Sequence, residues 1–401
     1  MQRRRITGIE GLRGIAAGGV LLCHFAQYSP HSTLTTVLGL PLRAGVELFF
    51  GLSAFLLFQP FAAAIVNGSS LPHTGRYLVR RARRIAPAYI AWVLLVSLVL
   101  GAAAAPPVHD APFGFQHDAG VIGSDLLLVQ NLRPSTFGSG IGPAWSLAIE
   151  AAFYLLLPLL AGGAMLLARR LRTRRARIGA ALAGPALLAL VGVGAKIVLP
   201  LAIAGSARHA ALPGSYQILD RSLLGCADLF APGMLLAVAV VARKEGVVVA
   251  PRVRSTLIRL LLIVGIPLLL VGSFLLPDPL FEPLIALAAC GVIALVVLQD
   301  GSGPGALARL LERRAPRLAG EISYSVFLIN LPLVVLLDRS GLYGSGAARI
   351  PLNLGLTIVA CGSLAWLSYR LIERPFMQPR RWSSIGVRAG RIRSAGRAKP
   401  T

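Results

Sequence analysis

Long apolar runs recur along almost the whole 401-residue chain, separated by short polar segments. Runs of about 20 apolar residues are long enough to cross a bilayer as helices. Gly and Pro interrupt several runs, and membrane helices tolerate them where neighbours satisfy the freed backbone groups. We therefore predict an all-α, polytopic membrane helix bundle of about ten spans, at residues 10–29, 44–66, 85–105, 144–168, 179–203, 223–242, 257–276, 281–299, 321–338 and 351–370.

The basic residues indicate the orientation of these spans. Lys and Arg number 40 against 16 Asp and Glu, which gives a formal net charge of +24. If the chain forms ten spans, 33 of the 40 Lys and Arg residues lie on the same side of the membrane as both termini. Six lie on the other side, and Lys196 lies inside a span. Cytoplasmic loops concentrate Lys and Arg, so we predict that both termini are cytoplasmic. The charge then serves topology, and no nucleic-acid partner is expected.

Composition supports a membrane domain and argues against a metal centre. Only 14% of the residues are charged, against about 25% in soluble domains. The four cysteines fall in apolar runs, where they are expected to be buried and unpaired. The longest outer loop, 106–143, carries His109, Asp110, His117 and Asp118, at spacings that match no standard metal site.

The chain is predicted to divide into a membrane domain, residues 1–376, and a basic tail, residues 377–401. The tail is rich in Arg, Gly and Ser and is expected to be disordered. It either contacts anionic membrane lipid or stays solvated.

Two ionisable residues stand inside the first apolar run, IEGLRGIAAGGVLLCHF. Arg13 and His24 are 11 residues apart, so on a helix they point the same way and lie about 16 Å apart along the axis. Ionisable groups within spans are costly unless paired or hydrated, which favours a functional role. The alternatives are an interfacial anchor for Arg13 and a structurally bonded core histidine for His24.

Two carboxylates are expected at the depth of His24 on neighbouring spans. Glu47 lies near the outer end of the second span, and Glu150 about one and a half turns below the outer end of the fourth. Ser146 and Tyr154 share a helix face with Glu150. A histidine polarised by a carboxylate suits general-base work on a hydroxyl, although buried polar networks are also purely structural.

A cluster of arginines lies on the predicted cytoplasmic side, in RYLVRRARRIAPAY. Arg80 and Arg84 share one helix face, as do Arg81 and Arg84. Together with Arg13 they present guanidinium groups, which are well suited to bind phosphates. The alternative is that they only set topology, as in the other basic loops.

Taken in order, these segments resemble the acyltransferase family 3 membrane proteins, which O-acylate glycans and other hydroxylated molecules. The matching motifs are the Arg13 and His24 pair, GVELFFGLSAFLL, RRARRIAPAY, WSLAIEAAFY, SYSVFLINLP and ERPF. Each motif is weak alone, but six in family order from residue 9 to residue 376 are specific.

The resemblance implies a ten-helix fold in which Arg13 and His24 are essential. It also implies a cytoplasmic acyl-CoA donor, acetyl-CoA first among them, and an acceptor hydroxyl on a glycan, a glycolipid or a glycosylated metabolite. No permanently bound cofactor is expected. We accordingly predict that the catalytic residues are His24 with Glu150 or Glu47, that acyl-CoA binds Arg13, Arg80 and Arg84, and that the substrate pocket includes Trp145, Ser146, Tyr154 and Asn330.

Two positions depart from the family pattern. Ala54 stands where a glycine is usual, which we interpret as a packing change. Asn330 stands where many relatives have histidine, and an amide cannot act as a base near pH 7, so the proton transfer is assigned to His24. Glu373, before Pro375 in ERPF, is interpreted as structural.

The main alternative is a transporter or flippase for an envelope glycolipid or glycan precursor, in which the buried charges form the transport path. Such proteins often contain two related halves, and the sequence shows no such symmetry. A non-catalytic subunit is a third hypothesis, disfavoured by His24 and Glu150. The Ala, Arg and Gly bias is typical of a high-GC bacterium, so we expect a multi-pass protein of its cell membrane. The acceptor, the acyl length, the membrane face of transfer and the oligomeric state stay open.

Overall fold

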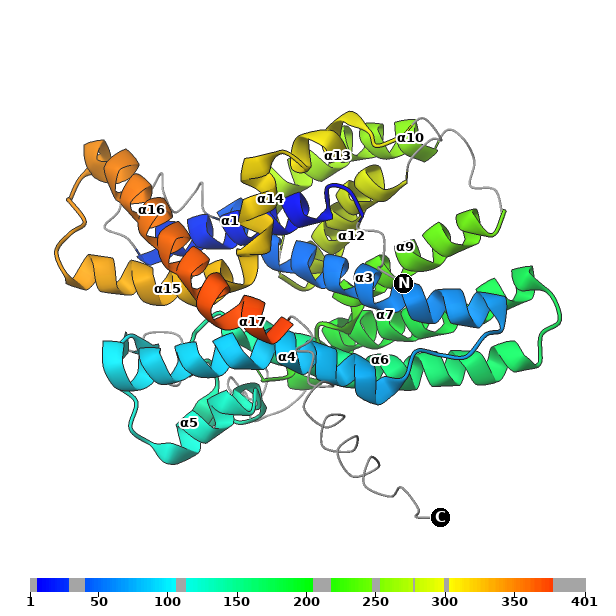
Figure 1. Cartoon of the computed structure of the whole chain (residues 1–401), viewed down its shortest axis with the longest axis horizontal. Coiled ribbons are helices and arrows are strands. Elements are labelled where there is room, and N and C mark those ends of the chain that lie inside the picture. The colour runs from blue at the N-terminus through cyan, green and yellow to red at the C-terminus, as the bar shows by residue number, and fades with distance from the viewer. Residues whose placement is uncertain are drawn as a thin grey trace, which may run out of the picture.

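The computed structural model describes residues 6–28, 40–105, 113–204, 218–246, 253–276, 278–298 and 303–377. Most of these residues are helical, and Figure 1 shows the long helices lying roughly side by side. The α-helices are α1 (Ile9–Tyr28), α3 (Gly45–Asn67), α4 (Thr74–Leu94), α5 (Ala119–Leu126), α6 (Ala144–Arg169), α7 (Arg174–Ala204), α9 (Ala227–Lys244), α10 (Val253–Leu260), α11 (Ser273–Leu275), α12 (Asp278–Val297), α13 (Ala306–Leu311), α14 (Arg314–Glu321), α15 (Ser323–Arg339), α16 (Ile350–Ser368) and α17 (Arg374–Met377).

Short 3-10 and π segments extend or connect these helices. The 3-10 segments are η1 (Leu40–Ala44), η3 (Gln130–Leu132), η4 (Pro134–Thr136) and η8 (Ala347–Arg349), and the π segments are η2 (Leu95–Leu100), η6 (Leu261–Gly265), η7 (Leu268–Gly272) and η9 (Tyr369–Glu373). The strands found in the described residues, β1 (Ala103–Ala104) and β2 (Phe113–Gly114), form one antiparallel pair.

Eight helical stretches among the described residues are long and apolar enough to cross a membrane. The pair α14 and α15 forms a ninth span if it is counted as one, bent by 72° at the break between the helices. The eight stretches are Ile9–Gln27, Pro41–Asn67, Thr74–Leu100, Ala144–Arg169, Arg174–Val198, Ser255–Gly272, Leu280–Val297 and Ile350–Met377. The predicted all-α membrane helix bundle is thereby confirmed.

The predicted span at residues 223–242 corresponds to helix α9, which carries charged residues near both of its ends. Its 18 residues include Asp228, Arg243 and Lys244. Because α9 packs against α3, α7 and α12 and buries most of its residues, protein rather than lipid surrounds much of it. A helix shielded in this way can carry polar groups that a lipid-facing helix cannot.

Small residues allow the backbones of the central helices to approach closely. A Cβ atom on Gly233 of α9 would lie 2.3 Å from the carbonyl oxygen of Gly51 in α3. Ala54, one turn further along α3, is fully buried in the same contact. A larger side chain at Gly233 would therefore push α9 away from α3, as expected for membrane helices that pack through small residues.

Helix α1 packs against both halves of the broken span, α14 and α15. A Cβ atom on Gly320 of α14 would lie 1.8 Å from the carbonyl oxygen of Glu10 in α1. This contact leaves no room for any other residue at position 320. It holds the start of α15 beside α1, the helix that carries Arg13 and His24.

The loop segment of residues 113–143 folds onto the bundle through buried polar contacts centred on Asp125. The hydroxyl of Tyr89 in α4 donates to the backbone oxygen of Asp125 at 2.7 Å. The hydroxyl of Ser139 donates to Asp125 Oδ1 at 2.5 Å, while Oδ2 has no hydrogen-bond partner among the described residues. Burial raises the pKa of Asp125 to about 7.

We predict that the protein loses stability as the pH rises through the acidic range. The folded state holds the Asp125 proton up to about pH 7, whereas the unfolded chain releases it near 3.8. The unfolding free energy therefore falls by about 1 to 4 kcal/mol across that window. Asp125→Asn keeps the acceptor oxygen without the charge, so the apparent Tm of this variant should depend less on pH. The measurement is the apparent Tm in nanodiscs as a function of pH.

Asp118→Asn is the matched control for this measurement. Asp118 is exposed and caps the start of α5 through Gly120 N at 2.7 Å, and asparagine can form the same cap. If both substitutions reduce the pH dependence of the apparent Tm equally, or if Asp125→Asn does not reduce it, then Asp125 is not the source of that pH dependence.

Candidate active site

Two cavities formed by the described residues bear on the candidate site. The large cavity, of about 700 Å³, is lined by residues of α1, α3, α4, α6, α9 and α15. The small cavity, of about 250 Å³, is lined by residues of α1, α3, α12, α15 and the start of α6. The large cavity falls in the volume range of small-molecule sites. Val46 and Phe327 line both cavities.

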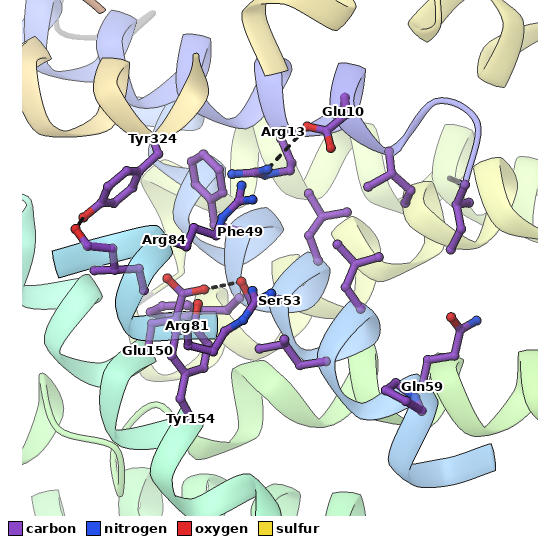
Figure 2. Close-up of a pocket in the computed structure, with 18 of the residues that line it drawn as sticks. Glu10, Arg13, Phe49, Ser53, Gln59, Arg81, Arg84, Glu150, Tyr154 and Tyr324 are labelled. Atoms are coloured by element: carbon purple, nitrogen blue, oxygen red, sulfur yellow. Dashed lines mark hydrogen bonds and ion pairs between the residues drawn. The ribbon is translucent and has the colours of Figure 1, made fainter. Parts of the chain in front are cut away.

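The large cavity is rich in guanidinium groups. Arg13, Arg81 and Arg84 all line it, and Figure 2 shows them on facing helices. Arg13 Nη1 pairs with Glu10 Oε2 of its own helix at 3.3 Å. Within the described part of the chain no carboxylate forms an ion pair with Arg81 or Arg84. Both guanidinium groups are therefore available to an anionic ligand.

The helical period of α4 decides which arginines reach the large cavity. Tyr77 and Ala88 are buried and mark the face of α4 that packs into the bundle. Arg81 and Arg84 lie on that face, at the spacings of four and seven residues from Tyr77. Arg80 was predicted to bind the donor, but it points elsewhere: it is exposed and lines neither cavity.

Glu150 lies in the large cavity with its predicted neighbours. Its Oε1 accepts a hydrogen bond from the hydroxyl of Ser53 in α3, and Tyr154 lies one turn below it (Figure 2). Ser146 lines the same cavity. Glu150 therefore does not share a cavity with His24, although the sequence places the two at similar depth.

His24 lines the small cavity and is hydrogen-bonded to Asn330, which the sequence assigned to the substrate pocket. The contact joins His24 Nδ1 to Asn330 Oδ1. Asn330 is fully buried in α15 and lines neither cavity. Its position is thus behind the histidine ring, in contact with the histidine rather than with a ligand.

The hydrogen bonds of Asn330 determine which ring nitrogen of His24 carries the proton. The amide nitrogen of Asn330 donates to the carbonyl oxygens of Val326, at 3.0 Å, and Phe327, at 2.7 Å. Only Oδ1 is then left for His24, and an oxygen without a proton must accept. Neutral His24 is therefore protonated at Nδ1, which leaves the lone pair of Nε2 for a substrate proton.

Glu47 shares the small cavity with His24. Its carboxylate is buried, and Oε2 has no hydrogen-bond partner among the described residues. A buried acceptor in this state is a natural partner for a hydroxyl group of a ligand.

Trp145 and Arg221 form one wall of the small cavity. The Arg221 guanidinium lies 4.3 Å from the centre of the Trp145 ring. The amide nitrogen of Asn131 donates to the backbone oxygens of both residues, at 2.9 and 3.0 Å. The wall is therefore fixed from behind by one buried side chain.

Behind this wall, buried charges of α7, α9 and α12 compensate one another. Lys196 Nζ lies 2.8 Å from Asp228 Oδ2 and 3.6 Å from Glu282 Oε2. Glu282 Oε1 in turn accepts from Arg221 Nη1 at 3.3 Å. Removing Lys196 would leave two buried carboxylates short of a counter-charge, which is costly within a membrane domain.

Several residues of the large cavity were not assigned to a site from the sequence, among them Ser53, Lys244 and Phe327, and Arg81 was noted only as sharing a helix face with Arg84. Two of them carried a signal. Ser53 stands inside the motif GVELFFGLSAFLL, and Arg81 falls on the buried stripe of α4. Lys244 ends a helix in a basic loop, and Phe327 is one apolar residue in an apolar helix, so neither stands out.

In the part of the chain that the structure describes, no group of three or more His, Cys, Asp or Glu is placed to hold a metal ion. His109 and Asp110 lie outside the described residues, whereas His117 is exposed and stacks on Phe115. All four cysteines are buried and free.

The comparison with protein families accounts for these features together. The family model for the acyltransferase domain of acyltransferase family 3 matches residues 6–369. The chain belongs to acyltransferase family 3. Its multiple apolar helices agree with a membrane protein of this family.

A curated relative is itself named as an acyltransferase. Over 162 residues the chain is 33% identical to the acyltransferase MdmB of Streptomyces mycarofaciens, a match that covers 39% of each protein. No solved structure matches the chain.

The motifs of this acyltransferase supply residues to both cavities. Arg13, Ser53 and Glu150 reach the large cavity from α1, α3 and α6. His24 and Glu47 reach the small cavity from α1 and α3. Glu373, of the ERPF motif, is buried and bonded to Ser325 of α15, in a position that fits a structural role.

We predict that Asn330→Ala lowers the rate of acyl transfer about 100-fold, because an unanchored His24 ring leaves its reactive position. Asn330→Asp keeps the acceptor oxygen and should lose less. The measurement is kcat in nanodiscs. Since Asn330 lines neither cavity, KM for the acyl donor should stay the same; a change confined to KM would contradict the positioning role.

Proposed function

We propose that the protein is a membrane O-acyltransferase that moves an acyl group, in the first instance acetyl, from acyl-CoA to a hydroxyl of a glycan, a glycolipid or a glycosylated metabolite. The donor binds in the large cavity and the acceptor hydroxyl in the small cavity. The observation that carries the proposal is the position of His24. Its contact with Asn330 leaves Nε2 as the free base nitrogen, and it lines the small cavity, which shares Val46 and Phe327 with the large cavity.

The large cavity has the chemistry that an acyl-CoA donor requires. Coenzyme A carries several phosphate charges, and guanidinium groups bind phosphate oxygens through paired hydrogen bonds. Arg81 and Arg84, without ion-pair partners in the described chain, supply these groups, and Arg13 adds a third. The positive-inside rule supports a cytoplasmic location for this arginine-bearing end, where acyl-CoA would be supplied.

The small cavity has groups that fit a hydroxylated acceptor. Trp145 offers a wide apolar ring, and Glu47 an acceptor oxygen without a partner. Arg221 and Gln27 add hydrogen-bond donors. Of the two carboxylates predicted to assist His24, we assign that task to Glu47, since it shares the cavity of the histidine.

The reaction follows from these positions. His24 Nε2 takes the proton of the acceptor hydroxyl, and the oxygen attacks the carbonyl carbon of the thioester. The new C–O bond forms and the C–S bond breaks. The sulfur leaves as the coenzyme A thiolate, which takes the proton from His24 Nε2. The products are the acylated acceptor and free coenzyme A, and His24 returns to its starting state.

We predict that His24→Ala lowers acyl transfer about 100- to 10,000-fold, as expected for loss of a general base. The measurement is transfer from, or hydrolysis of, radiolabelled acetyl-CoA by the purified protein in nanodiscs. His117→Ala is the matched control, because His117 is exposed and lines neither cavity.

Equal turnover by folded wild type and His24→Ala would remove His24 from the chemistry. A wild type that neither binds nor consumes acetyl-CoA or longer acyl-CoAs would overturn the donor assignment and favour transport instead.

A second prediction separates arginines of one helix. Arg84→Ala should weaken acyl-CoA binding about tenfold or more, because a guanidinium–phosphate contact is lost. Arg80→Ala should leave binding unchanged, since Arg80 lines neither cavity. Binding of radiolabelled acetyl-CoA at equilibrium distinguishes them. Equal losses in both variants would mean that only the general positive charge of this end matters.

A further inference from the structure

The two cavities meet at an apolar partition. Val46 of α3 and Phe327 of α15 are the residues common to both linings. The residues that follow Val46 in α3 line different cavities: Glu47 lines the small cavity and Phe49 lines the large one. Phe49 also packs edge-to-face on Phe327, with 6.2 Å between ring centres. A donor in the large cavity therefore meets aromatic and branched side chains before it reaches His24.

Only the acyl end of the donor can enter this partition. The phosphates of coenzyme A belong with Arg81 and Arg84, and moving ions between apolar side chains would be costly. An acyl chain has the opposite preference, since it loses contact with water when it packs against Val46 and Phe327.

The chemistry requires the carbonyl carbon of the thioester to come close to the acceptor oxygen, at about 3 to 3.5 Å. That oxygen must itself lie within hydrogen-bond reach of His24. The atoms attached to the carbonyl then lie at the partition or just beyond it. The small cavity, of about 250 Å³, must hold the acceptor hydroxyl as well. Little room is left for a long acyl chain.

We propose that the partition of Val46 and Phe327 selects the acyl group, and that Phe327 sets the longest acyl chain that the enzyme transfers. This inference rests on the proposed use of acyl-CoA as the donor. Phe327 is buried and bulky, and its ring occupies the space that additional methylene groups would need.

The side chain of Phe327 can be changed without removing the contact that positions His24. Asn330 is held by the backbone oxygen of Phe327, at 2.7 Å, and not by its ring. Substitution of the ring therefore preserves the hydrogen bond from Asn330 and, through it, the orientation of His24. This separates an effect on acyl length from an effect on the base.

The test compares kcat/KM for hexanoyl-CoA and acetyl-CoA, measured as thiol release with methyl glucoside or water as acceptor. Phe327→Ala should raise the ratio of hexanoyl-CoA to acetyl-CoA use by at least about tenfold, since single methylene groups change selectivity by about that factor. Phe327→Leu and Val46→Ala should give smaller shifts in the same direction. Both remain informative if Phe327→Ala does not fold.

Phe153→Leu is the matched control. Phe153 is fully buried, stacks on Phe230 at 4.2 Å between ring centres, and lines neither cavity. It reports the loss of a core aromatic ring without any change at the partition, so its ratio should equal that of the wild type.

Two outcomes would overturn the inference in different ways. If folded Phe327 variants use acetyl-CoA but keep the wild-type ratio, the partition does not select acyl length, and the proposed function stands. If the wild type neither binds nor consumes any acyl-CoA, the donor assignment fails and the inference fails with it.

Discussion

The hydrogen bond between Asn330 and His24 is the contact on which the proposed acyl-transfer chemistry depends. A histidine inside a membrane bundle needs a partner, and its partner decides which nitrogen can accept a proton. Here the amide of Asn330 is tied to two carbonyls of α15, so its oxygen must face His24. The broken span makes this possible, because α14 and α15 both pack against α1, with Gly320 directly on the α1 backbone.

The bundle distributes its polar groups between two cavities. Guanidinium groups of α1 and α4 gather in the large cavity with Glu150, whereas His24 and Glu47 lie in the small one with Arg43 and Arg221. In a low-dielectric interior, charges interact over longer distances than in water, so the placement of the arginines affects both cavities. The apolar partition of Val46 and Phe327 lies between the proposed donor site and the proposed base.

The wall behind the small cavity shows how the bundle accommodates charge. Helix α9 carries Asp228, Arg243 and Lys244, yet most of its residues are buried. Its Asp228 pairs with Lys196, which also approaches Glu282, and the series ends at Arg221 over the ring of Trp145. Each charge thus has an opposite neighbour, as buried ions require. The series also fixes the position of Arg221, so the shape of the small cavity is linked to the packing of α7, α9 and α12.

The sequence by itself determined the membrane bundle, because long apolar runs have few other ways to satisfy their backbone groups. It also marked Arg13 and His24 as functional candidates and, through six ordered motifs, pointed to the family. It did not determine which helix faces meet. The structure decided that Arg81 rather than Arg80 reaches the large cavity, that Glu150 and His24 line different cavities, and that Asn330 holds His24. These outcomes depend on the rotation of each helix about its axis, which is set by close contacts between residues far apart in the chain, such as Gly233 with Gly51. Sequence spacing records the face of one helix at a time, and only tertiary packing brings two faces together.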